Sequence, residues 1–486
     1  ILAISALSAI YAFYHRSSTY WQRRGVVAVP PRSMIFGSMK DLTQKDYPRP
    51  LKYRDWGKKY GKTYGIKEGV HNTLVTSDLE MIHEIFVKQF DYFHSRKRAV
   101  LGPDLEKDAR VTLFQSRGAR WKRLRTISSR SFSVSCLKKI HPIVEDSVLN
   151  MVRIMEERHA GGGVFNIHQF YCEFTMDTIS RLVMGQKESL IFNNPRVAVV
   201  QSLFLRDFDI PVVHLNLAIP PLNPITRWSM KTFATKMSED DKKLNAEMAE
   251  AVYERIKQRE SDQSEDSTET DDFIDLFLDF AAEKAEEEKK EFRLNEAPVS
   301  KNLTVDEVVA QARVFLLAGF DTTANALGYT SWMLSCHPEV LQRCQEEIDE
   351  NCCEESISYE DLSNLTYIEA VCKETLRFYP LGAFANSRQC MKETEVCGLI
   401  IEKGNNIQVL LEEKINIKEL IDTEFSREGQ SCAELIDDFQ VDTYGLHFDP
   451  SIWGEDVDEF KPERWLDSDR RVPPHAYIPF GVGPRI

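Results

Sequence analysis

One long helix, predicted over residues 305–336, most constrains what this chain can fold into. Its start is marked by Thr304 and Glu307, which have the spacing of a capping box. Its end is marked by Pro338, because the residue before a proline is pushed out of the helical region. At about 1.5 Å per residue the helix is about 45–50 Å long, enough to cross a whole domain. Its middle is apolar nearly all round, which predicts that it is buried.

The middle of this helix carries the run AGFDTT at residues 318–323, which breaks several local rules at once. Gly319 costs about 1 kcal/mol relative to alanine inside a helix, and a buried Asp321 carboxylate needs a partner. Such exceptions at one place indicate a functional site, where small residues admit a flat ligand and the acid and alcohol pass protons. The alternative is a contact with a neighbouring helix through glycine and alanine, together with a hydrogen-bonded aspartate.

The composition argues against two kinds of partner. The net charge of −15 disfavours nucleic acid, because binding to phosphates requires a basic field. The 10 cysteines form no CxxC pair, which fits a reducing compartment and buried thiols. The 11 histidines show no HExxH spacing, so the sequence does not predict a zinc site.

Residues 1–24 predict an N-terminal membrane anchor. Basic and aromatic residues directly follow the apolar run of residues 1–14: His15, Arg16, Tyr20, Trp21, Arg23 and Arg24. This order is typical of an anchor whose following chain faces the cytoplasm. The run is shorter than the about 20 residues of a spanning helix. We therefore expect an incomplete anchor, with a signal segment or a buried N-terminal helix as alternatives.

Most of the remaining chain reads as helical, with β-like runs at residues 62–66 and 72–76 and a further run that ends at Gln408. Residues 209–225 are apolar and broken by prolines, which predicts either a lid at a membrane surface or a buried loop. Residues 259–272 are polar and acidic, which is typical of a disordered connection. Residues 283–291 predict a charged helix before the long one.

A basic helix is predicted over residues 118–140. Trp121 and Arg125 are four residues apart and therefore share one face. In an acidic protein such a local basic cluster indicates a binding site for an anion. Further cations provide either a positive docking surface or a solvated helix face: Lys122, Arg123, Lys138 and Lys139.

Five motifs occur in a fixed order along the chain. They are Trp121-x-x-x-Arg125, AGFDTT at 318–323, Glu374-x-x-Arg377, Pro462-Glu-Arg464 and Phe480-Gly-x-Gly-x-Arg485. Each is weak alone, but the ordered set resembles the cytochrome P450 family, in particular the membrane-anchored animal members that oxidise drugs, toxins and lipids. The resemblance covers residues 25–486. It implies a mainly α fold, with a large helical domain and a small β-sheet domain.

The resemblance also implies roles for individual residues. Asp321 and Thr322 would guide protons during dioxygen activation, and Glu374, Arg377 and Arg464 would form a buried charge cluster. The residues around the cofactor, haem b, would be Trp121, Arg125, Ala318, Arg388, Phe480, Gly481 and Arg485. Those facing the substrate would be Phe315, Phe320, Leu381 and Phe384. The lid at residues 203–230 and the loop around 100–114 would cover the substrate channel.

The implied activity is that of a haem-thiolate monooxygenase. It would insert one oxygen atom of O2 into an apolar small molecule of the xenobiotic, steroid or fatty-acid class. Electrons would come from NADPH-cytochrome P450 reductase, an acidic donor suited to the basic patch. We expect a monomer on the cytosolic face of the endoplasmic reticulum membrane, held by a single N-terminal anchor. A reductase-independent isomerase or lyase is an alternative, which the Asp321–Thr322 pair disfavours.

Two features depart from the family pattern. The family's axial cysteine, whose thiolate binds the iron, is expected immediately after Ile486. From the sequence alone we therefore expect a chain without its axial ligand, and a non-catalytic product is a further alternative. Residues 409–440 interrupt the run that should continue from Gln408 to Val441, and they are acidic. They predict either a retained non-coding stretch or a surface excursion.

Overall fold

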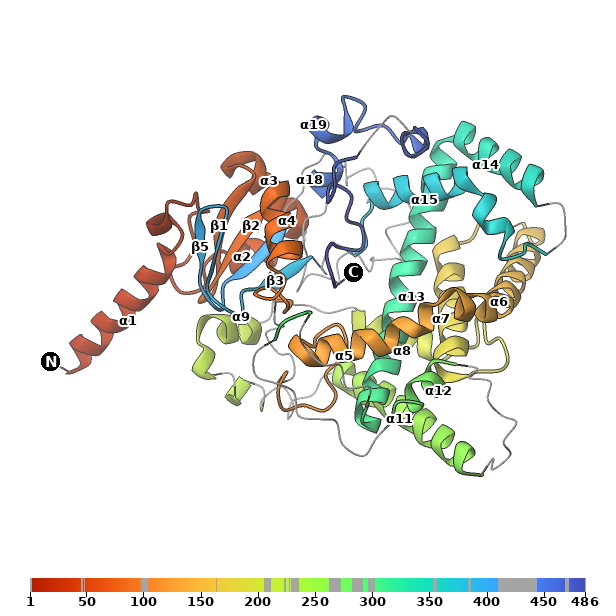
Figure 1. Cartoon of the computed structure of the whole chain (residues 1–486), viewed down its shortest axis with the longest axis horizontal. Coiled ribbons are helices and arrows are strands. Elements are labelled where there is room, and N and C mark those ends of the chain that lie inside the picture. Colours follow the sequence, from red (N-terminus) through yellow and green to blue (C-terminus); the bar gives the residue numbers. More distant parts are fainter. Residues whose placement is uncertain are drawn as a thin grey trace. The chain divides into compact units, whose positions relative to one another are not determined.

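The computed structural model describes residues 2–44, 47, 49–97, 104–162, 164–204, 211–222, 224–226, 228, 236–261, 272–281, 292–295, 302–352, 356–382, 386–409, 444–467 and 472–485. The chain divides into two compact units (Figure 1). Unit 1 consists of Ile1–Gly102, Leu205–Phe233 and Lys373–Ile486. Unit 2 consists of Pro103–Phe204 and Ala234–Cys372.

Unit 2 is built from helices. Its α-helices are α5 (Gly118–Ser128), α6 (Val134–Ala160), α7 (Ile167–Met184), α8 (Arg196–Phe204), α11 (Lys236–Ser261), α12 (Phe273–Leu278), α13 (Val305–Cys336) and α14 (Pro338–Asn351). Short 3-10 helices lie at Ser129–Phe132 and Asp361–Asn364. The helix α15 (Thr366–Phe378) begins in unit 2 and ends in unit 1.

The long helix predicted over residues 305–336 is α13, with the same bounds. The predicted capping box is present, since Thr304 and Glu307 each accept from the other's backbone N–H. Pro338 begins the next helix, α14, so this proline stands at the start of one helix directly after the end of another.

The apolar core of unit 2 gathers around α13, and α7 packs against it (Figure 1). Helices α5, α8, α11 and α12 contribute further buried apolar side chains. The prediction that the middle of α13 is buried all round is wrong on one side. Leu316 and Phe320 are fully buried, whereas Ala318 and Thr323 are exposed.

Unit 1 contains the sheets. Four strands pair in the order β1 (Thr63–Glu68), β2 (His71–Thr76), β6 (Asn406–Val409) and β3 (Ser387–Gln389). The pair β2 and β6 is parallel and the other two pairs are antiparallel. A separate hairpin consists of β4 (Thr394–Val396) and β5 (Leu399–Ile401). The β-like runs predicted at residues 62–66 and 72–76 are confirmed as β1 and β2, and so is the mainly α fold with a small β-sheet region.

The helices of unit 1 are mostly short. They are α1 (Leu2–Ser18), α2 (Met39–Leu42), α3 (Arg49–Tyr60), α4 (Leu79–His83), α9 (Pro211–Ala218), α18 (Tyr444–His447) and α19 (Pro450–Trp453). A π-helical turn, η2 (Glu84–Lys88), continues from α4. Short 3-10 helices lie at Gln22–Arg24, Pro220–Leu222 and Pro462–Trp465 (η8).

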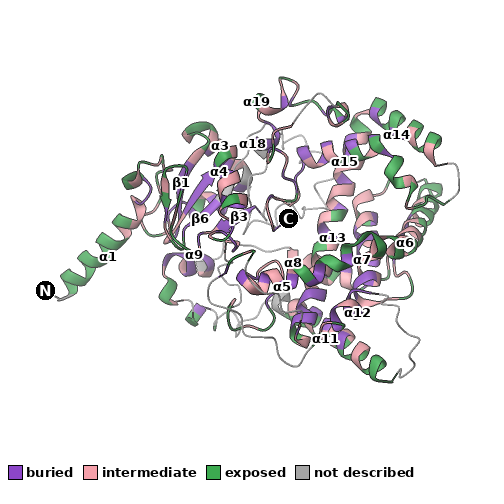
Figure 2. Cartoon of the chain, in the orientation of Figure 1, coloured by how far each residue is buried: buried purple, intermediate pink, exposed green. Residues whose placement is uncertain are grey.

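The N-terminal helix α1 is exposed along most of its length (Figure 2). Apolar side chains such as Ile4, Leu7 and Ile10 are more than half exposed, at 70%, 66% and 53%. Within the part of the chain that the structure describes, no helix combines the length and apolar character needed to cross a bilayer. The anchor expected over residues 1–24 stays a prediction.

The proline-broken segment 209–225 is described over residues 211–222. Pro211 begins α9, whose Val213 and Leu217 are buried together with Met39, as the buried alternative implies. The predicted helix 283–291 lies outside the described residues. So do residues 262–271 of the acidic connection, residues 410–440 of the suspected insertion and residues 205–210 of the lid.

Candidate functional site

The middle of α13 keeps one side open. Ala318 is exposed and Thr322, one turn later, is half-buried, although Leu316 and Phe320 on the same helix are fully buried. The Thr322 hydroxyl donates to the carbonyl oxygen of Ala318 at 2.7 Å. This bond back to the preceding turn is the one expected of a threonine inside a helix. Small side chains therefore form an open strip along one side of a helix that is otherwise in the core.

Gly319 and Asp321, in the same motif, face the protein interior. A Cβ on Gly319 would lie 2.7 Å from Cδ1 of Ile179, so glycine lets α7 approach α13 closely. Asp321 is only 1% exposed, and its Oδ2 accepts from Nδ2 of Asn325 at 3.1 Å. The contacts of Gly319 and Asp321 agree with the helix-contact alternative, while the open strip at Ala318 and Thr322 agrees with the ligand interpretation.

The aromatic residues expected to face substrate lie in different surroundings. Phe320 belongs to the buried core of unit 2, so the expectation that it faces a substrate is not met. The reason is helical geometry, since two residues turn the chain by about 200° from Thr322. Phe315 is half-buried, with its ring stacked on Phe277 at 5.9 Å between centroids.

Two further residues complete the expected substrate set. Leu381 is half-buried in the turn that follows α15. Phe384 lies outside the described residues.

Helix α5 carries the two expected haem partners of unit 2. Trp121 is 3% exposed, and its ring meets the edge of Phe292 at 6.5 Å between centroids. Arg125 lies one turn later and is half-buried, and burial lowers the pKa of its guanidinium. A cation that burial disfavours is stabilised by a nearby anion.

A buried ion cluster fixes α5 to the start of α13. Glu307, the capping-box residue, accepts from both terminal nitrogens of Arg123 at 2.9 Å each and from Nε of Arg120 at 3.1 Å. Glu307 and Arg123 are 2% and 4% exposed. Bidentate pairs between guanidinium and carboxylate are among the strongest hydrogen-bonded contacts in proteins. Because Arg120 and Arg123 share a helix with Trp121 and Arg125, this cluster sets the orientation of the haem partners.

This cluster corrects the expected docking surface. Arg123 was assigned to a solvent-facing patch, but it is buried against Glu307 because α5 packs on α13. Lys122 is half-buried and donates to the carbonyl oxygen of Leu294. Of the expected patch, Lys138 and Lys139 remain near the surface, and Lys138 pairs with Glu360.

Unit 1 contains two further arginines that the family pattern assigns to the haem. Arg388 on β3 is 1% exposed and donates to the carbonyl oxygen of Ser387 at 2.8 Å. Its guanidinium carbon lies 4.2 Å from the ring centroid of Phe86. Burial first, and then the like charge of Arg96, hold the pKa of Arg388 well below its ordinary value. Arg485 is 4% exposed and donates to the carbonyl oxygen of His94.

The loop before Arg485 depends on two glycines in the left-handed region. Gly481 and Gly483 have φ of +95° and +79°. A Cβ on Gly483 would lie 2.1 Å from the carbonyl oxygen of Phe86, so only glycine permits this approach. Phe86 lies in the π-helical turn η2, a type of turn that is frequent at functional sites. Phe480 is 65% exposed.

The predicted charge cluster of Glu374, Arg377 and Arg464 is brought together in unit 1. All three side chains are 0% exposed. Arg377 donates to both carboxylate oxygens of Glu374, at 3.0 and 2.9 Å, and Arg464 donates to one of them at 2.8 Å. The indole N–H of Trp465 and the backbone N–H of Lys461 donate to the same carboxylate at 2.9 and 3.1 Å. The cluster therefore ties α15 to η8.

His447 is a site residue that sequence reasoning missed. It is fully buried, and burial together with the charge of Arg377 lowers its pKa to about 3, so the ring is neutral. Its Nε2 accepts from the backbone N–H of Ile478 at 2.9 Å, and its Nδ1 lies 3.1 Å from the carbonyl oxygen of Arg377. Nδ1 therefore carries the proton. One ring thus connects the charge cluster to the glycine loop, and no sequence motif marks this connection.

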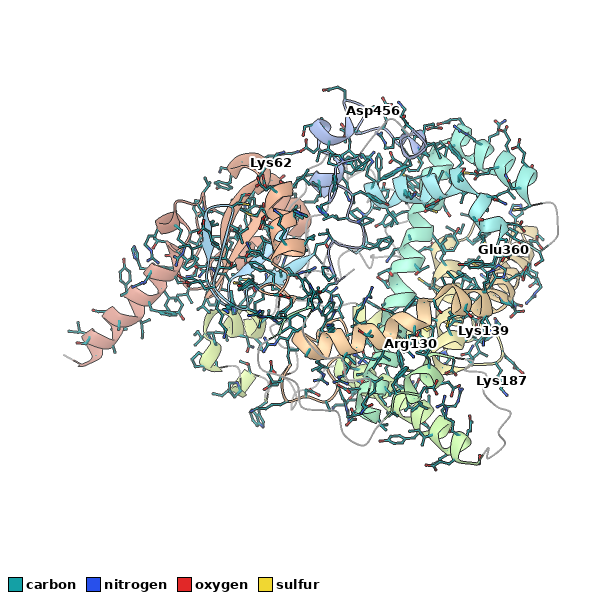
Figure 3. The ribbon with its side chains drawn as sticks, viewed as in Figure 1. Lys62, Arg130, Lys139, Lys187, Glu360 and Asp456 are labelled. Carbon is teal, nitrogen blue, oxygen red and sulfur yellow. The ribbon has the colours of Figure 1, made fainter. Side chains whose placement is uncertain are left out.

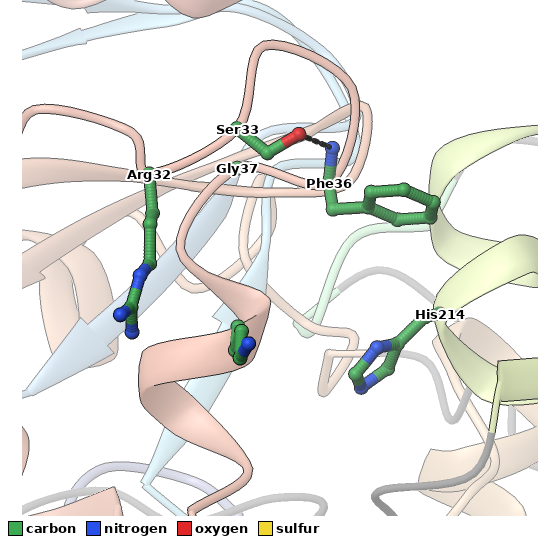
Figure 4. A pocket seen from close by; sticks show the side chains of 6 residues that line it. Arg32, Ser33, Phe36, Gly37 and His214 are labelled. Carbon is green, nitrogen blue, oxygen red and sulfur yellow. Dashed lines mark hydrogen bonds between the residues drawn. The ribbon is translucent and has the colours of Figure 1, made fainter.

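A pocket of about 360 Å³ lies within unit 1 (Figure 4). Its lining comprises Arg32, Ser33, Phe36, Gly37, Lys40 and His214. Arg32 pairs with Asp41 at 2.9 Å, and the Ser33 hydroxyl accepts from the backbone N–H of Phe36 at 3.2 Å. The lining contains none of the residues assigned to the haem or to the substrate.

Nearly the whole chain is similar to known proteins. The family model described as cytochrome P450 matches residues 27–413 and 437–486. The putative cytochrome P450 CYP13A1 of Caenorhabditis elegans is 40% identical over 488 residues, which cover 98% of this chain and 86% of that protein. The putative cytochrome P450 CYP13A3 of the same organism is 39% identical, and the match covers 100% of this chain and 88% of that protein.

Replacing Glu374 with glutamine should strongly destabilise unit 1. The variant leaves two buried guanidiniums without their carboxylate, and breaking a buried charge set in this way costs about 3–5 kcal/mol. We expect a large drop in the denaturant midpoint, or no folded protein. The control is Lys461→Ala, which removes a pair with Asp456 whose lysine is 47% exposed and should cost less than about 1 kcal/mol. Equal losses in the two variants would contradict this.

The Glu307 cluster should make the free energy of unfolding depend on pH in the acid range. Burial by itself raises the pKa of Glu307, but hydrogen bonds and the charge of Arg123 outweigh it, and the pKa lies below its ordinary value of 4.5. A lowered pKa stabilises the fold above the ordinary value, and this contribution is lost as pH falls below it.

We therefore expect Glu307→Gln to lower the unfolding midpoint at pH 7 and to lose part of the decline seen below about pH 4.5. The matched control, Asp306→Asn, removes an exposed pair with Arg110 and should change little, since both side chains are more than half exposed. Thermal unfolding at pH 7 and pH 4 measures both variants. A pH dependence identical to that of the unmodified protein would refute the role of Glu307.

Proposed function

The chain belongs to the cytochrome P450 family of haem-thiolate monooxygenases, and we propose that it inserts one oxygen atom of O2 into an apolar small molecule. The substrate class we propose is xenobiotic, steroid or fatty acid. The observation that carries the proposal is the open strip of Ala318 and Thr322 in a helix that is otherwise buried. Small side chains at this place leave room for a flat cofactor and a substrate beside a hydroxyl group.

The described residues fit haem b as the cofactor. When bound, haem supplies the iron centre at which dioxygen is activated. Ala318 and the Thr322 turn offer a flat, open surface in unit 2, where Trp121 and the half-buried Arg125 would hold a propionate. In unit 1, Arg388 and Arg485 would serve the same purpose. Burial lowers the pKa of Arg388, and a propionate would supply an anion that stabilises its charge.

Thr322 and Asp321 would carry the protons of the reaction. The Thr322 hydroxyl uses its hydrogen on the Ala318 carbonyl, so its oxygen is placed to accept a further hydrogen bond from the open side. Asp321 is the preceding residue and holds its carboxylate inside unit 2. An acid inside and an alcohol at the open strip give protons a way from the interior to the site. A reductase-independent isomerase or lyase does not need this pair.

We also propose that NADPH-cytochrome P450 reductase supplies the electrons. Arg130 and Lys139 stand exposed in unit 2, where an acidic donor would find cations (Figure 3). The exposed apolar side chains of α1 support a single N-terminal anchor in the endoplasmic reticulum membrane, with the remaining chain as a monomer on the cytosolic face.

Turnover of the full-length protein tests the proposal. We expect the reduced, CO-bound protein to show the absorption band of haem-thiolate proteins, and product to appear only with NADPH and the reductase. Rearrangement of organic peroxides without reductase, and no NADPH-dependent product, would instead support the isomerase alternative.

Thr322→Ala should lower product per NADPH several-fold and raise hydrogen peroxide release. Its control is Thr330→Ala, which removes the same kind of bond, to Ala326 at 2.8 Å, from the same helix.

We propose further that residues 409–440 are an insertion that the family fold does not contain. The family match stops at residue 413 and resumes at 437, inside this acidic stretch. The described strand β6 ends at Val409 and α18 begins at Tyr444. The transcript sequence tests the proposal, and we expect the codon of Gln408 to join that of Val441. A transcript that keeps the stretch, together with protease cleavage inside it in the native protein, would show a real surface excursion.

A further inference from the structure

A hydrogen-bonded chain links the surface end of α7 to the buried carboxylate of α13. We propose that His168 and Asn325 are positioning residues that hold the Asp321 carboxylate, and that they thereby set how much of the electron supply ends in product. This inference rests on the proposed monooxygenase function. It assigns a role to two residues outside the five sequence motifs.

The geometry comes from two pairs of residues, each spaced by one helical turn. Asp321 and Asn325 lie four residues apart on α13, and His168 and Cys172 lie four residues apart on α7, so each pair shares a face. Asn325 Nδ2 donates to Asp321 Oδ2 at 3.1 Å, and His168 Nε2 lies 3.0 Å from Asn325 Oδ1. Cys172 Sγ lies 3.8 Å from Nδ1 of His168.

The direction of donation follows from the chemistry of the groups. An ionised carboxylate only accepts, so the amide of Asn325 must present its NH2 group to Asp321. Its carbonyl oxygen is then turned to the imidazole, and Nε2 of His168 must carry the hydrogen in this contact. Every donor in the chain therefore points toward Asp321. The carboxylate holds the amide, and the amide selects the tautomer of the ring.

The surrounding fold is shaped for this ring. A Cβ on Gly328 would lie 3.3 Å from Cδ2 of His168, so glycine at this position leaves space for the imidazole. The backbone N–H of His168 donates to the capping side chain of Asn166 at 3.0 Å, which fixes the ring at the first turn of α7. His168 is half-buried and Asp321 is 1% exposed, so the chain runs from the partly exposed end of a helix to its interior neighbour.

The groups that lead to Asp321 in this hydrogen-bonded series are neutral. Burial lowers the pKa of His168, and the bond to Asn325 opposes this only in part, so the ring is uncharged near neutral pH. Burial, and then the charge of Asp321, raise the pKa of the Cys172 thiol to about 12. Asn325 has no charge at any pH. Asn325 is therefore a neutral donor to Asp321, and a hydrogen bond from a neutral donor is weaker than one from a cation.

The competing explanation is that these groups only satisfy one another at a helix contact. Tyr171 and Ser331 supply the comparison, because their hydroxyls form a 2.6 Å bond in the same interface of α7 and α13. A purely structural role predicts that Asn325→Leu and Tyr171→Phe behave alike. A positioning role predicts that only Asn325→Leu changes how much product and how much hydrogen peroxide form per NADPH.

The experiment compares these variants in the full-length holoprotein with reductase and a turned-over substrate. For Asn325→Leu we expect product per NADPH to fall several-fold and hydrogen peroxide to rise, since the buried carboxylate loses its donor. The rate of oxidation supported by an organic hydroperoxide, which bypasses proton delivery, should stay within twofold of the unmodified protein. The amplitude of the CO-bound absorption band should stay within twofold as well. His168→Leu should act in the same direction, and His168→Gln, which keeps a donor, should restore coupling. Tyr171→Phe should leave coupling unchanged.

A readout independent of turnover completes the test. The shifts in thermal midpoint of Asn325→Leu and Asp321→Asn should not add, because the two residues share one hydrogen bond. Additive shifts, a loss of hydroperoxide-supported activity in parallel with coupling, or equal effects of Asn325→Leu and Tyr171→Phe would each overturn the inference. Failure of the proposed function gives a different result from these outcomes. The unmodified protein would then make no NADPH-dependent product, although the shifts in thermal midpoint would still be non-additive. That result would refute the role of the two residues in coupling.

Discussion

A buried carboxylate that accepts from two guanidiniums organises each unit of this protein. In unit 1, Glu374 joins α15 to η8, and Arg377 continues through His447 to the backbone of the glycine loop. In unit 2, Glu307 joins the start of α13 to α5 and so orients the expected haem partners. Taking these charges out of water is costly unless every lone pair is used. Each cluster therefore admits few arrangements, and this restriction is what fixes the residues of the site.

Sequence patterns predicted the bounds of the helices better than they predicted which side chains are buried. The bounds of α13 followed from a capping box and a proline, which act locally and are therefore readable from the sequence. The direction of individual side chains depends on which helix packs on which side, and α7 decides this for α13. Phe320 and Arg123 were misplaced for this reason, since both are buried by tertiary packing that a single sequence does not encode locally. His447 was missed because its ring nitrogens bond to backbone groups, which no sequence motif records.

The motif at residues 318–323 shows why a strong sequence signal still left two interpretations open. At about 100° per residue, neighbours in a helix point to different sides, so one short motif contributes to several surfaces. Ala318 and Thr322 make the open strip, whereas Gly319 and Asp321 make the contact with α7. The open strip agrees with the functional interpretation and the α7 contact agrees with the structural one, for different residues of the same turn. Asn325, two residues beyond the motif and one turn after Asp321, lies on the same face as Asp321.

Three buried carboxylates of this chain differ in what holds them, and the difference bears on function. Glu307 and Glu374 accept from pairs of guanidiniums, and breaking such sets costs about 3–5 kcal/mol, which keeps them fixed. Asp321 accepts from an amide, and a hydrogen bond to a charged group contributes about 1.5–3 kcal/mol. A minor conformation within a few kcal/mol of the major one is populated at about 0.1–10%. Because the hydrogen bond from Asn325 falls in this range, that contact fixes its acceptor less firmly than the arginines fix the two glutamates.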